Sequence, residues 1–196
     1  MPYRALIFDL DGTLADTMPT HYEAWSATLA RYDLQMSEDR FYALGGWPTI
    51  AVSELVAKES GRPPELARQM ADEKESLFER SLHLILPVEP VLAVAREHRG
   101  KLAMAVATGA TRHICEQILG HLGATDWFDA SVSSEDVPTH KPEPDIFLEA
   151  ARRLGIDPQH CCVYEDTDPG IEAARRAGME YVDVRKLYTP RRVTRA

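Results

Sequence analysis

From residue 87 onward the sequence alternates between short apolar runs and longer segments that are typical of helices. Counting an apolar run at residues 5–8, the expected strands are 5–8, 101–107, 128–132, 161–164 and 181–184. The expected helices of this part are 88–98, 112–122, 144–154 and 169–177. Strands and helices that alternate in this way form a parallel sheet with helices on both faces. The sequence therefore predicts an α/β core.

Residues 15–85 follow a different pattern, with helical segments and no expected strand. The expected helices of this part are 19–32, 49–60 and 65–82, with breaks at 45–48 and 61–64. Asp16 or Thr17 stands where it could cap the first of these helices. Because this segment directly follows the first strand, we expect a small α-helical cap at residues 15–85. The core would then comprise residues 1–14 and 86–196.

Composition narrows the class of protein. A chain of 196 residues, 44% of them hydrophobic, is long enough to bury a core. Its net charge of −9 disfavours nucleic acid or an anionic membrane surface as the main partner. No apolar run approaches the length of a membrane span. The three cysteines lack a zinc or redox spacing, so we expect a cytoplasmic protein. We also expect a monomer or weak homodimer.

The basic residues are unevenly placed, because the end of the chain carries positive charge alone. From Val184 onward there is no acidic residue, and the basic ones are Arg185, Lys186, Arg191, Arg192 and Arg195. A run of like charge at a terminus is usually solvated. We therefore expect a frayed, solvated tail rather than an interaction arm.

Two aspartates directly follow the first apolar run. Asp9 and Asp11 stand at the carboxyl end of the expected strand, and Gly12 permits a sharp turn after them. Ligands of open parallel sheets bind at the carboxyl ends of the strands. Two neighbouring carboxylates favour a bound cation, and Mg²⁺ prefers such hard oxygen ligands. For these residues alone, a plain turn rich in Asp and Gly is the alternative.

Polar residues also follow the expected strand at 101–107. Thr108, Gly109, Ala110 and Thr111 precede a helix there, and a hydroxyl with backbone N–H groups at a helix start binds phosphate oxygens well. A helix N-cap beside a turn glycine would use the same residue types. This segment is therefore compatible with a phosphate site without requiring one.

Two further segments carry charged residues. Lys141 lies in a turn flanked by prolines just before a helix, where a fixed positive charge could stabilise a transferring phosphoryl group. A solvated surface lysine is the alternative for this residue. Glu165 and Asp166 come at the end of the expected strand at 161–164 and offer a second source of metal ligands.

Taken in order, these four segments resemble the signature motifs of the haloacid dehalogenase superfamily. The segments are 9–14, 108–109, 141–142 and 165–170, and the resemblance spans almost the whole chain. Within the superfamily the sequence is similar to the β-phosphoglucomutase-like branch, and to its small bacterial fructose-1-phosphate/6-phosphogluconate phosphatases. His21, Trp25 and residues 45–46 fall where that branch places cap residues. The resemblance implies a Rossmann-like core with a small helical cap after the first strand.

The resemblance also implies a mechanism. Asp9 would attack the phosphorus of a small phosphate monoester and form an aspartyl-phosphate, and Asp11 would serve as acid and then as base. Mg²⁺ would be bound by the Asp9 carboxylate, the Asp11 backbone carbonyl and Asp166. Glu165 would either bind the metal directly or contact the residues that bind it.

Other residues would bind the substrate. Lys141 and the Thr108 hydroxyl, with the Gly109 or Ala110 amide, would hold the phosphoryl oxygens. In the cap, the residues implied to contact the rest of the substrate are His21, Gly46 and Trp47. The expected activity is therefore hydrolysis of a small sugar phosphate by a Mg²⁺-dependent phosphatase.

Two other functions compete with a phosphatase. A sugar-phosphate mutase of the same branch would have an arginine-bearing segment where this chain has residues 47–49, Trp-Pro-Thr. Without that cation a bisphosphate intermediate is disfavoured. A non-enzymatic phosphosugar sensor would have no need of Asp9, Asp11 and Lys141 together. A kinase of the P-loop type is excluded because the sequence has no G-x-x-x-x-G-K-[ST] segment.

Overall fold

The computed structural model describes residues 3–193 and divides the chain into two compact units. The first, which we call the core unit, contains residues 3–16 and 86–190. The second, the cap unit, contains residues 17–85 and 191–193. The expected domain boundaries differ from this division at residues 15–16, which join the core unit, and at residues 191–193, which join the cap unit.

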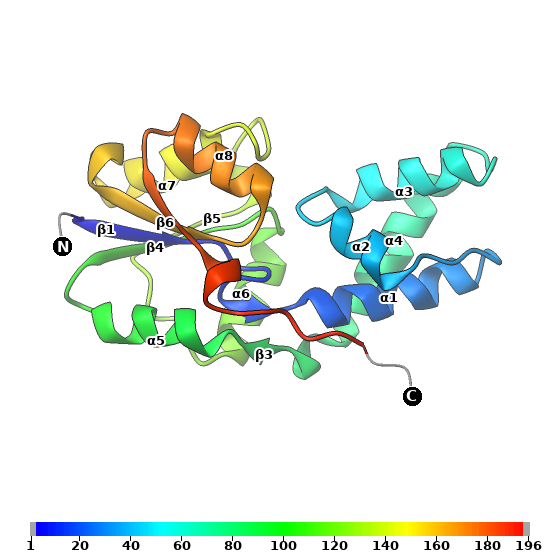
Figure 1. Cartoon of the computed structure of the whole chain (residues 1–196), viewed down its shortest axis with the longest axis horizontal. Helices are drawn as coiled ribbons and strands as arrows, with labels where there is room; N and C mark the ends of the chain where they lie inside the picture. The colour runs from blue at the N-terminus through cyan, green and yellow to red at the C-terminus, as the bar shows by residue number, and fades with distance from the viewer. Residues whose placement is uncertain (1–2, 194–196) are drawn as a thin grey trace. The chain divides into compact units, whose positions relative to one another are not determined.

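A five-stranded parallel sheet forms the centre of the core unit (Figure 1). Its strands are β1 (Ala5–Phe8), β4 (Ala103–Ala107), β5 (Ala130–Val132), β6 (Cys161–Glu165) and β7 (Glu180–Asp183), in the spatial order β5-β4-β1-β6-β7. β1 is thus the central strand, and Phe8 pairs with Val106 on one side and Tyr164 on the other. The predicted α/β fold with a Rossmann-like sheet is confirmed.

Four helices cover the two faces of this sheet. They are α5 (Glu89–His98), α6 (Arg112–His121), α7 (Asp145–Leu154) and α8 (Asp168–Arg176). Figure 1 shows α7 and α8 on one face and α5 and α6 on the other. Short 3-10 turns accompany the core at η2 (Ser134–Asp136), η3 (Pro158–His160) and η4 (Val184–Lys186). These helix positions agree with the sequence expectation to within one or two residues.

Small side chains on the sheet allow close packing of α7. Ala5, Ala105 and Ala107 are fully buried and belong to the same hydrophobic cluster as Phe147 of α7. The large aromatic ring fills the space that the alanines leave. The central strands are therefore buried on both faces, as parallel strands between two helical layers usually are.

A two-stranded antiparallel ribbon lies where the chain leaves and re-enters the core unit. β2 (Ala15–Asp16) pairs with β3 (Leu86–Pro87), and Asp16 is opposite Leu86. The expectation of no strand within residues 15–85 is therefore wrong at β2. Two residues are too few to produce a period-2 pattern that sequence could reveal. Thr17 occupies the N-cap position of the next helix, but its side chain makes no capping hydrogen bond.

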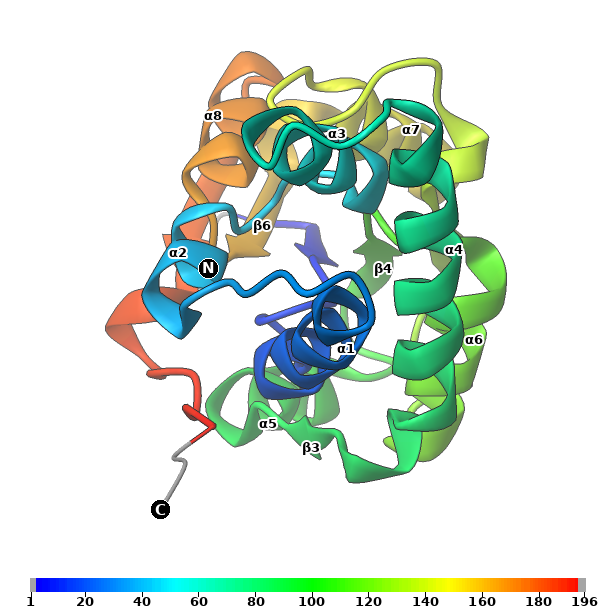
Figure 2. The ribbon, with the colours of Figure 1, turned by 90° about the vertical axis from the view of Figure 1, so that its right-hand side faces the viewer.

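The cap unit is helical. Its helices are α1 (Met18–Ala30), α2 (Glu38–Ala43), α3 (Thr49–Glu59) and α4 (Glu65–Arg80), followed by the 3-10 turn η1 (Leu82–Leu84). Trp25, Leu29 and Met70 are buried in one cluster formed by these helices, and Figure 2 shows α1 and α4 close to one another. α2 was not expected. It has only six residues, and Ser37 caps it by accepting a hydrogen bond from the Arg40 N–H.

Within the described residues the C-terminal segment makes specific contacts, so the expectation of a frayed tail is wrong there, although most of these residues are exposed to solvent as expected. Arg185 forms ion pairs with Asp183 and Asp168 in the core unit, and Arg192 pairs with Asp39 in the cap unit. Arg192 thus meets an acidic partner that is remote in sequence, whereas one partner of Arg185 is only two residues away. Arg195 lies outside the described residues.

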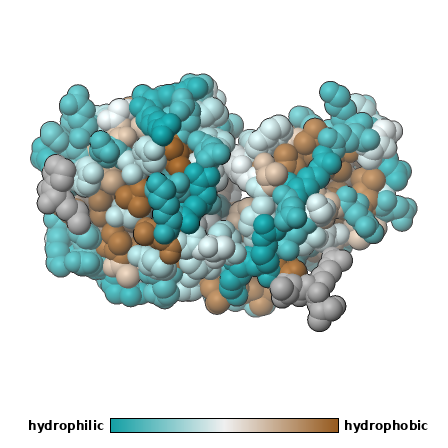
Figure 3. Space-filling model, in the orientation of Figure 1, coloured by the Kyte–Doolittle hydropathy of each residue, from teal (hydrophilic) through white to brown (hydrophobic). Residues whose placement is uncertain are grey.

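The surface carries mostly polar side chains. On the face drawn in Figure 3, hydrophilic residues cover most of each unit, and hydrophobic residues form smaller areas between them. Cys115, Cys161 and Cys162 are buried free thiols. Within residues 3–193, no helix has both the length and the apolar character needed to cross a membrane.

Candidate active site

The candidate site lies in the core unit, at the carboxyl ends of the three central strands. Asp9 directly follows β1, Thr108 directly follows β4, and Glu165 ends β6. β1 lies between β4 and β6. The strands that follow β1 in sequence are therefore added first on one edge of the sheet, as β4 and β5, and then on the other, as β6 and β7. Such a switch in strand order leaves a crevice at the carboxyl ends, where ligands of this fold class bind.

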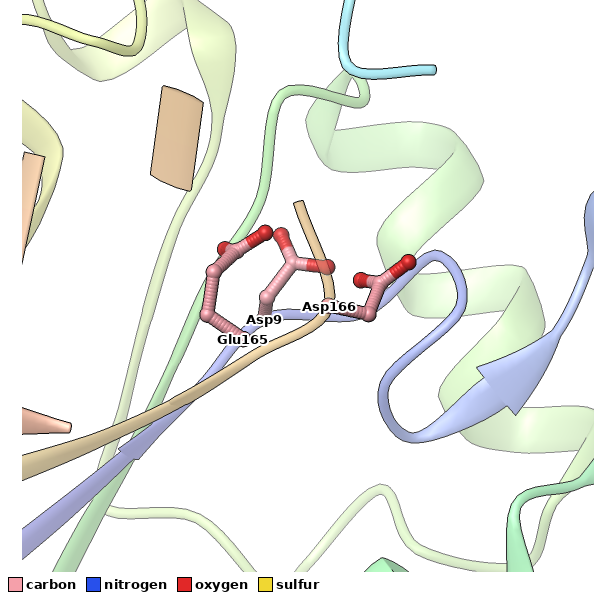
Figure 4. A group of neighbouring side chains, drawn as sticks. All are labelled: Asp9, Glu165 and Asp166. Atoms are coloured by element: carbon pink, nitrogen blue, oxygen red, sulfur yellow. The ribbon is translucent and has the colours of Figure 1, made fainter. Parts of the chain in front are cut away.

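Three carboxylates meet in this crevice. One oxygen from each of Asp9, Glu165 and Asp166 lies within 4.8 Å of the others. Figure 4 shows the three side chains projecting from the ends of β1 and β6 toward a common region. Asp9 and Glu165 are buried, with exposed fractions of 5% and 1%. The register of the sheet explains this, because pairing of Phe8 with Tyr164 places the next residues, Asp9 and Glu165, side by side.

Lys141 joins two of these carboxylates. Its Nζ donates to Oδ1 of Asp9 at 2.5 Å and to Oε2 of Glu165 at 2.7 Å. The lysine lies in the turn before α7, where the peptide bond to Pro142 is cis. Its Nζ also lies 5.1 Å from the centre of the Phe147 ring. Burial alone would lower the pKa of Lys141, but the charges of Asp9 and Glu165 outweigh it and hold that pKa above its usual range.

Glu165 is held on its other side by the start of α8. Its Oε1 accepts from the Thr167 N–H at 3.1 Å and from the Thr167 hydroxyl at 2.6 Å. A Cβ added to Gly170 would lie 2.0 Å from Cδ of Glu165, so only glycine leaves room for the carboxylate here. Both oxygens of Glu165 are therefore engaged by protein groups, which suits an anchor for Lys141.

The remaining negative charge in the crevice is poorly compensated. One lysine faces three carboxylates, and burial, followed by the charge of Glu165, raises the pKa of Asp9 well above its usual range. The same two causes raise the pKa of Asp166 to about 7. Carboxylates in this condition bind a proton or a cation. The site is therefore suited to a divalent metal.

The donor set and the local backbone also fit a hard cation such as Mg²⁺, which prefers oxygen ligands. The Asp166 Oδ1 accepts from the Thr13 hydroxyl at 3.0 Å, which orients the carboxylate. A Cβ at Gly12 would lie 2.2 Å from Oδ2 of Asp166, and Gly12 has a φ of +81°. This position requires glycine for both reasons. The turn also brings Asp11 beside the carboxylates, with the Gly12 N–H bonded to the Ala15 carbonyl at 2.8 Å.

Thr108 closes the other side of the crevice. Its side chain is fully buried, and its Oγ1 accepts from the Ala110 N–H at 3.0 Å. Thr111 caps α6 by accepting from the Ile114 N–H. Of the two amides expected to hold phosphate, that of Ala110 is bonded to Thr108 in this structure. The helix cap is confirmed, while the binding of phosphate by this segment stays a prediction.

The predicted cap residues belong to the other unit. His21 stacks on Phe78 with ring centres 3.7 Å apart. Trp47 is 50% exposed, so it is not packed inside the cap unit. Gly46, which precedes it, has a φ of +83° that favours glycine.

A charged cluster around His21 was missed by the sequence analysis. Nζ of Lys74 lies 2.8 Å from Nδ1 of His21 and 3.1 Å from Oε1 of Glu75, and it donates to the Thr49 hydroxyl at 3.4 Å. Lys74 is only 2% exposed. A signal was present, since Lys74 interrupts the apolar face that Met70 and Phe78 define on α4. A lysine on the buried face of a helix needs a partner.

The chain matches the haloacid dehalogenase-like hydrolase family over residues 6–184. It is 42% identical to fructose-1-phosphate phosphatase YqaB of Escherichia coli K12 over 188 residues, which cover 94% of this chain and 98% of that one. It is 32% identical to the phosphorylated carbohydrates phosphatase of Thermotoga maritima, over 91% of this chain and 83% of that one. Among solved structures, β-phosphoglucomutase from Clostridium difficile has a TM-score of 0.78 at 27% identity, covering 92% and 84%.

The chain therefore belongs to the haloacid dehalogenase-like hydrolase family, and the family resemblance of its four motifs is confirmed. Its similarity to phosphatases over nearly its whole length makes it a phosphoric monoester hydrolase. The predicted enzyme class is confirmed as well.

Proposed function

We propose that this enzyme is a Mg²⁺-dependent phosphatase of small sugar phosphates that works through an aspartyl-phosphate on Asp9. The observation that carries the proposal is the position of Asp9, buried at the centre of the sheet edge, held by Lys141 and surrounded by two further carboxylates. A carboxylate fixed in this way can act as a nucleophile. Its relatives, named as fructose-1-phosphate and phosphorylated-carbohydrate phosphatases, support the substrate class.

The first half-reaction transfers the phosphoryl group to Asp9. A carboxylate oxygen of Asp9 attacks phosphorus while the ester bond to the sugar oxygen breaks. Asp11, on the turn two residues later, gives its proton to that oxygen, and the sugar leaves as an alcohol. Lys141 and the Thr108 hydroxyl bind the phosphoryl oxygens and stabilise the charge that builds up on them.

The second half-reaction releases phosphate. Asp11, now ionised, accepts a proton from water, and the water oxygen attacks phosphorus. The bond to Asp9 breaks, which yields inorganic phosphate and restores both aspartates. When bound, Mg²⁺ would offset repulsion between Asp9 and the anionic substrate. Asp9, the Asp11 carbonyl and Asp166 would hold the metal. Both oxygens of Glu165 are already hydrogen-bonded to protein groups, which favours a role in positioning Lys141 over one as a metal ligand.

Substrate choice is assigned to the cap unit. The exposed Trp47 offers an aromatic surface for a sugar face, and the partly exposed His21 and Glu75, held by the buried Lys74, offer groups for sugar hydroxyls. A mutase is the second candidate, since β-phosphoglucomutase has a similar fold. Trp47, Pro48 and Thr49 supply no cation for the far phosphate of a bisphosphate, so we favour hydrolysis.

The test is a steady-state assay of phosphate release over a panel of hexose, polyol and sugar-acid phosphates, with Mg²⁺ present. We expect stoichiometric phosphate and a clear preference for some sugar phosphates. Acid-quenched enzyme should carry one phosphoryl group on the peptide that contains Asp9. The mutase is tested with β-glucose-1-phosphate and a trace of the 1,6-bisphosphate. Isomerisation much faster than phosphate release would refute the phosphatase, as would the lack of any release.

A further inference from the structure

The C-terminal segment makes a third covalent connection between the two units. The chain first passes from the core unit to the cap unit between Asp16 and Thr17, and it returns between Ile85 and Leu86. It passes to the cap unit again between Pro190 and Arg191. The first two connections lie next to each other, because β2 pairs with β3. Two adjacent connections form a hinge about which a cap can rotate.

The third connection starts from the same place on the core unit. The Tyr188 hydroxyl donates to Oδ2 of Asp16 at 2.7 Å, and Asp16 is fully buried in β2. The backbone of this segment is also fixed, since the N–H groups of Leu187 and Tyr188 bond to the Val184 carbonyl at 2.8 and 2.9 Å. Tyr188 therefore anchors the segment at the hinge ribbon.

The far end of the segment is attached to α2 of the cap unit. The Tyr42 hydroxyl donates to the Arg191 carbonyl at 2.7 Å, and the Val193 N–H donates to Oε1 of Glu38 at 2.7 Å. The Arg192 guanidinium pairs with Asp39 at 2.9 Å and lies 4.1 Å from the centre of the Tyr42 ring.

Val193 adds an apolar contact, because it packs against the hydrophobic cluster of the cap unit. Each contact alone is modest, but five contacts on the three consecutive residues 191–193 hold one short segment. The segment is therefore docked at both ends, on two different units.

The length of chain between these anchors is short. From Tyr188 to Arg191 there are three peptide steps, which reach at most about 10–11 Å when fully extended. With both ends docked, the backbone between Tyr188 and Arg191 sets an upper limit on how far the two docking points can separate. A third covalent connection that is docked on α2 restricts the relative motion that two adjacent connections alone would permit.

We propose that residues 188–193 form a strap that limits opening of the cap, with Tyr188 and Arg192 as its positioning residues. The strap keeps the cap's substrate-contacting residues within a restricted range of positions. It thereby lowers KM for substrates that need the cap, while the chemistry on Asp9 proceeds without it. This inference goes beyond the proposed function, because it rests on contacts that do not depend on what the enzyme hydrolyses.

The first arm of the test measures cap motion without any substrate. Donor and acceptor dyes are attached at Lys58→Cys in the cap unit and Lys101→Cys in the core unit, both exposed positions. We compare the distribution of dye distances in the parent, Tyr188→Phe, Arg192→Ala and the double variant. We expect each single variant to broaden the distribution. The double variant should broaden the distribution by less than the sum of the two single effects, because weakening either end already loosens the strap.

The second arm measures kinetics. Freeing either end should raise KM for the preferred sugar phosphate about threefold to tenfold, a size typical of a loosened lid contact, while kcat on a small aryl phosphate stays within about twofold. The matched control is Arg96→Ala. Arg96 likewise pairs with a carboxylate, Glu89 at 3.9 Å, and with an aromatic ring, Trp127 at 5.5 Å, but lies on α5.

Distinct outcomes overturn the proposal. Unchanged distance distributions in both variants would refute it, and so would effects of the two variants that simply add. A change in Tyr188→Phe alone, with a lowered melting temperature, would assign that residue a local role at Asp16 instead. Lack of phosphatase activity in the parent would refute the proposed function and leave the distance measurement to decide the strap.

Discussion

Nζ of Lys141 lies 2.5 Å from Oδ1 of Asp9, across 132 positions of sequence. The lysine thereby fixes one oxygen of a buried carboxylate and restrains its rotation. Glu165 holds the same lysine from the opposite side. In the proposed reaction this arrangement would hold the nucleophile ready for attack before substrate arrives, which reduces the reorganisation needed in the transition state.

Replacement of Asp9 by asparagine should abolish turnover and preserve the fold. The amide is nearly the same size as the carboxylate but is a poor nucleophile and a poorer metal ligand. We expect kcat to fall by at least about a thousandfold, as for other covalent nucleophiles. Phosphate release and circular dichroism check the two halves of this prediction. Activity within tenfold of the parent would remove Asp9 from this role.

Removal of divalent metal should silence the enzyme reversibly. The three carboxylates of Asp9, Glu165 and Asp166 carry more negative charge than Lys141 balances, so an anionic substrate would be repelled from the metal-free site. EDTA should stop phosphate release, and added Mg²⁺ should restore it. Asp166→Ala should show the same loss at ordinary Mg²⁺ concentrations. Equal rates with EDTA and with Mg²⁺ would contradict the metal site.

Gly170→Ala should disturb the anchor of Lys141. The new Cβ would lie 2.0–2.4 Å from carboxylate atoms of Glu165, so that side chain must move. We expect a loss of stability of about 1–3 kcal/mol, typical of overpacking, and a kcat reduced more than tenfold.

The control for this variant is Gly120→Ala in α6. A Cβ at Gly120 meets only the Thr125 hydroxyl, at 3.9 Å, which is an ordinary contact. This change should leave activity alone and stabilise the helix by up to about 1 kcal/mol. Thermal unfolding together with kcat distinguishes the two glycines. Equal behaviour of the two variants would contradict a special role for Gly170.

Trp47→Ala should change the preference among substrates. Its side chain is half exposed and follows a glycine of positive φ, so it is available to contact a sugar. We expect relative kcat/KM values across sugar phosphates to shift by about tenfold, as for the loss of one aromatic contact. The rate on a small aryl phosphate should change little. A uniform decrease on all substrates would favour a structural role.

The three thiols should resist alkylation in the native protein. Burial, followed by the charges of Asp11 and Asp9, raises the pKa of Cys115 to about 12, and burial raises that of Cys161 to about 11. The thiolate is the reactive form, and at pH 8 only about one Cys115 thiol in ten thousand is ionised, which slows alkylation. Iodoacetamide at pH 8 should label the unfolded chain at all three cysteines and leave the native chain unlabelled, as mass spectrometry would show.

The sequence predicted the elements whose signals are local. The apolar run before Asp9 and the alternating segments after residue 87 identified the sheet and its helices, because each strand and helix is long enough to show its own pattern. The short elements gave no such signal. α2 has six residues and β2 has two, and β2 forms only by pairing with β3, about seventy residues away in sequence.

The site was predictable in its residue types but not in its contacts. A lysine in a turn is usually solvated, and only the fold reveals that Lys141 reaches Asp9 and Glu165. Lys74 was overlooked because a single charged residue on an apolar helix face indicates no function from sequence alone. Only the fold shows that His21 lies beside it. Likewise, positive charge near the end of the chain suggested solvent, because the acidic partner of Arg192 is Asp39, far away in sequence.

All the groups assigned to the chemical step belong to a single unit. Asp9, Thr108, Lys141 and Glu165 are held by the sheet, by α7 and α8, and by bonds among themselves, while the residues assigned to substrate choice sit on an inserted segment. Mutations in that insert can therefore accumulate without altering the distances between nucleophile, lysine and carboxylates. Such an enzyme can acquire a new substrate by changing one unit, and its reaction is inherited unchanged by its descendants.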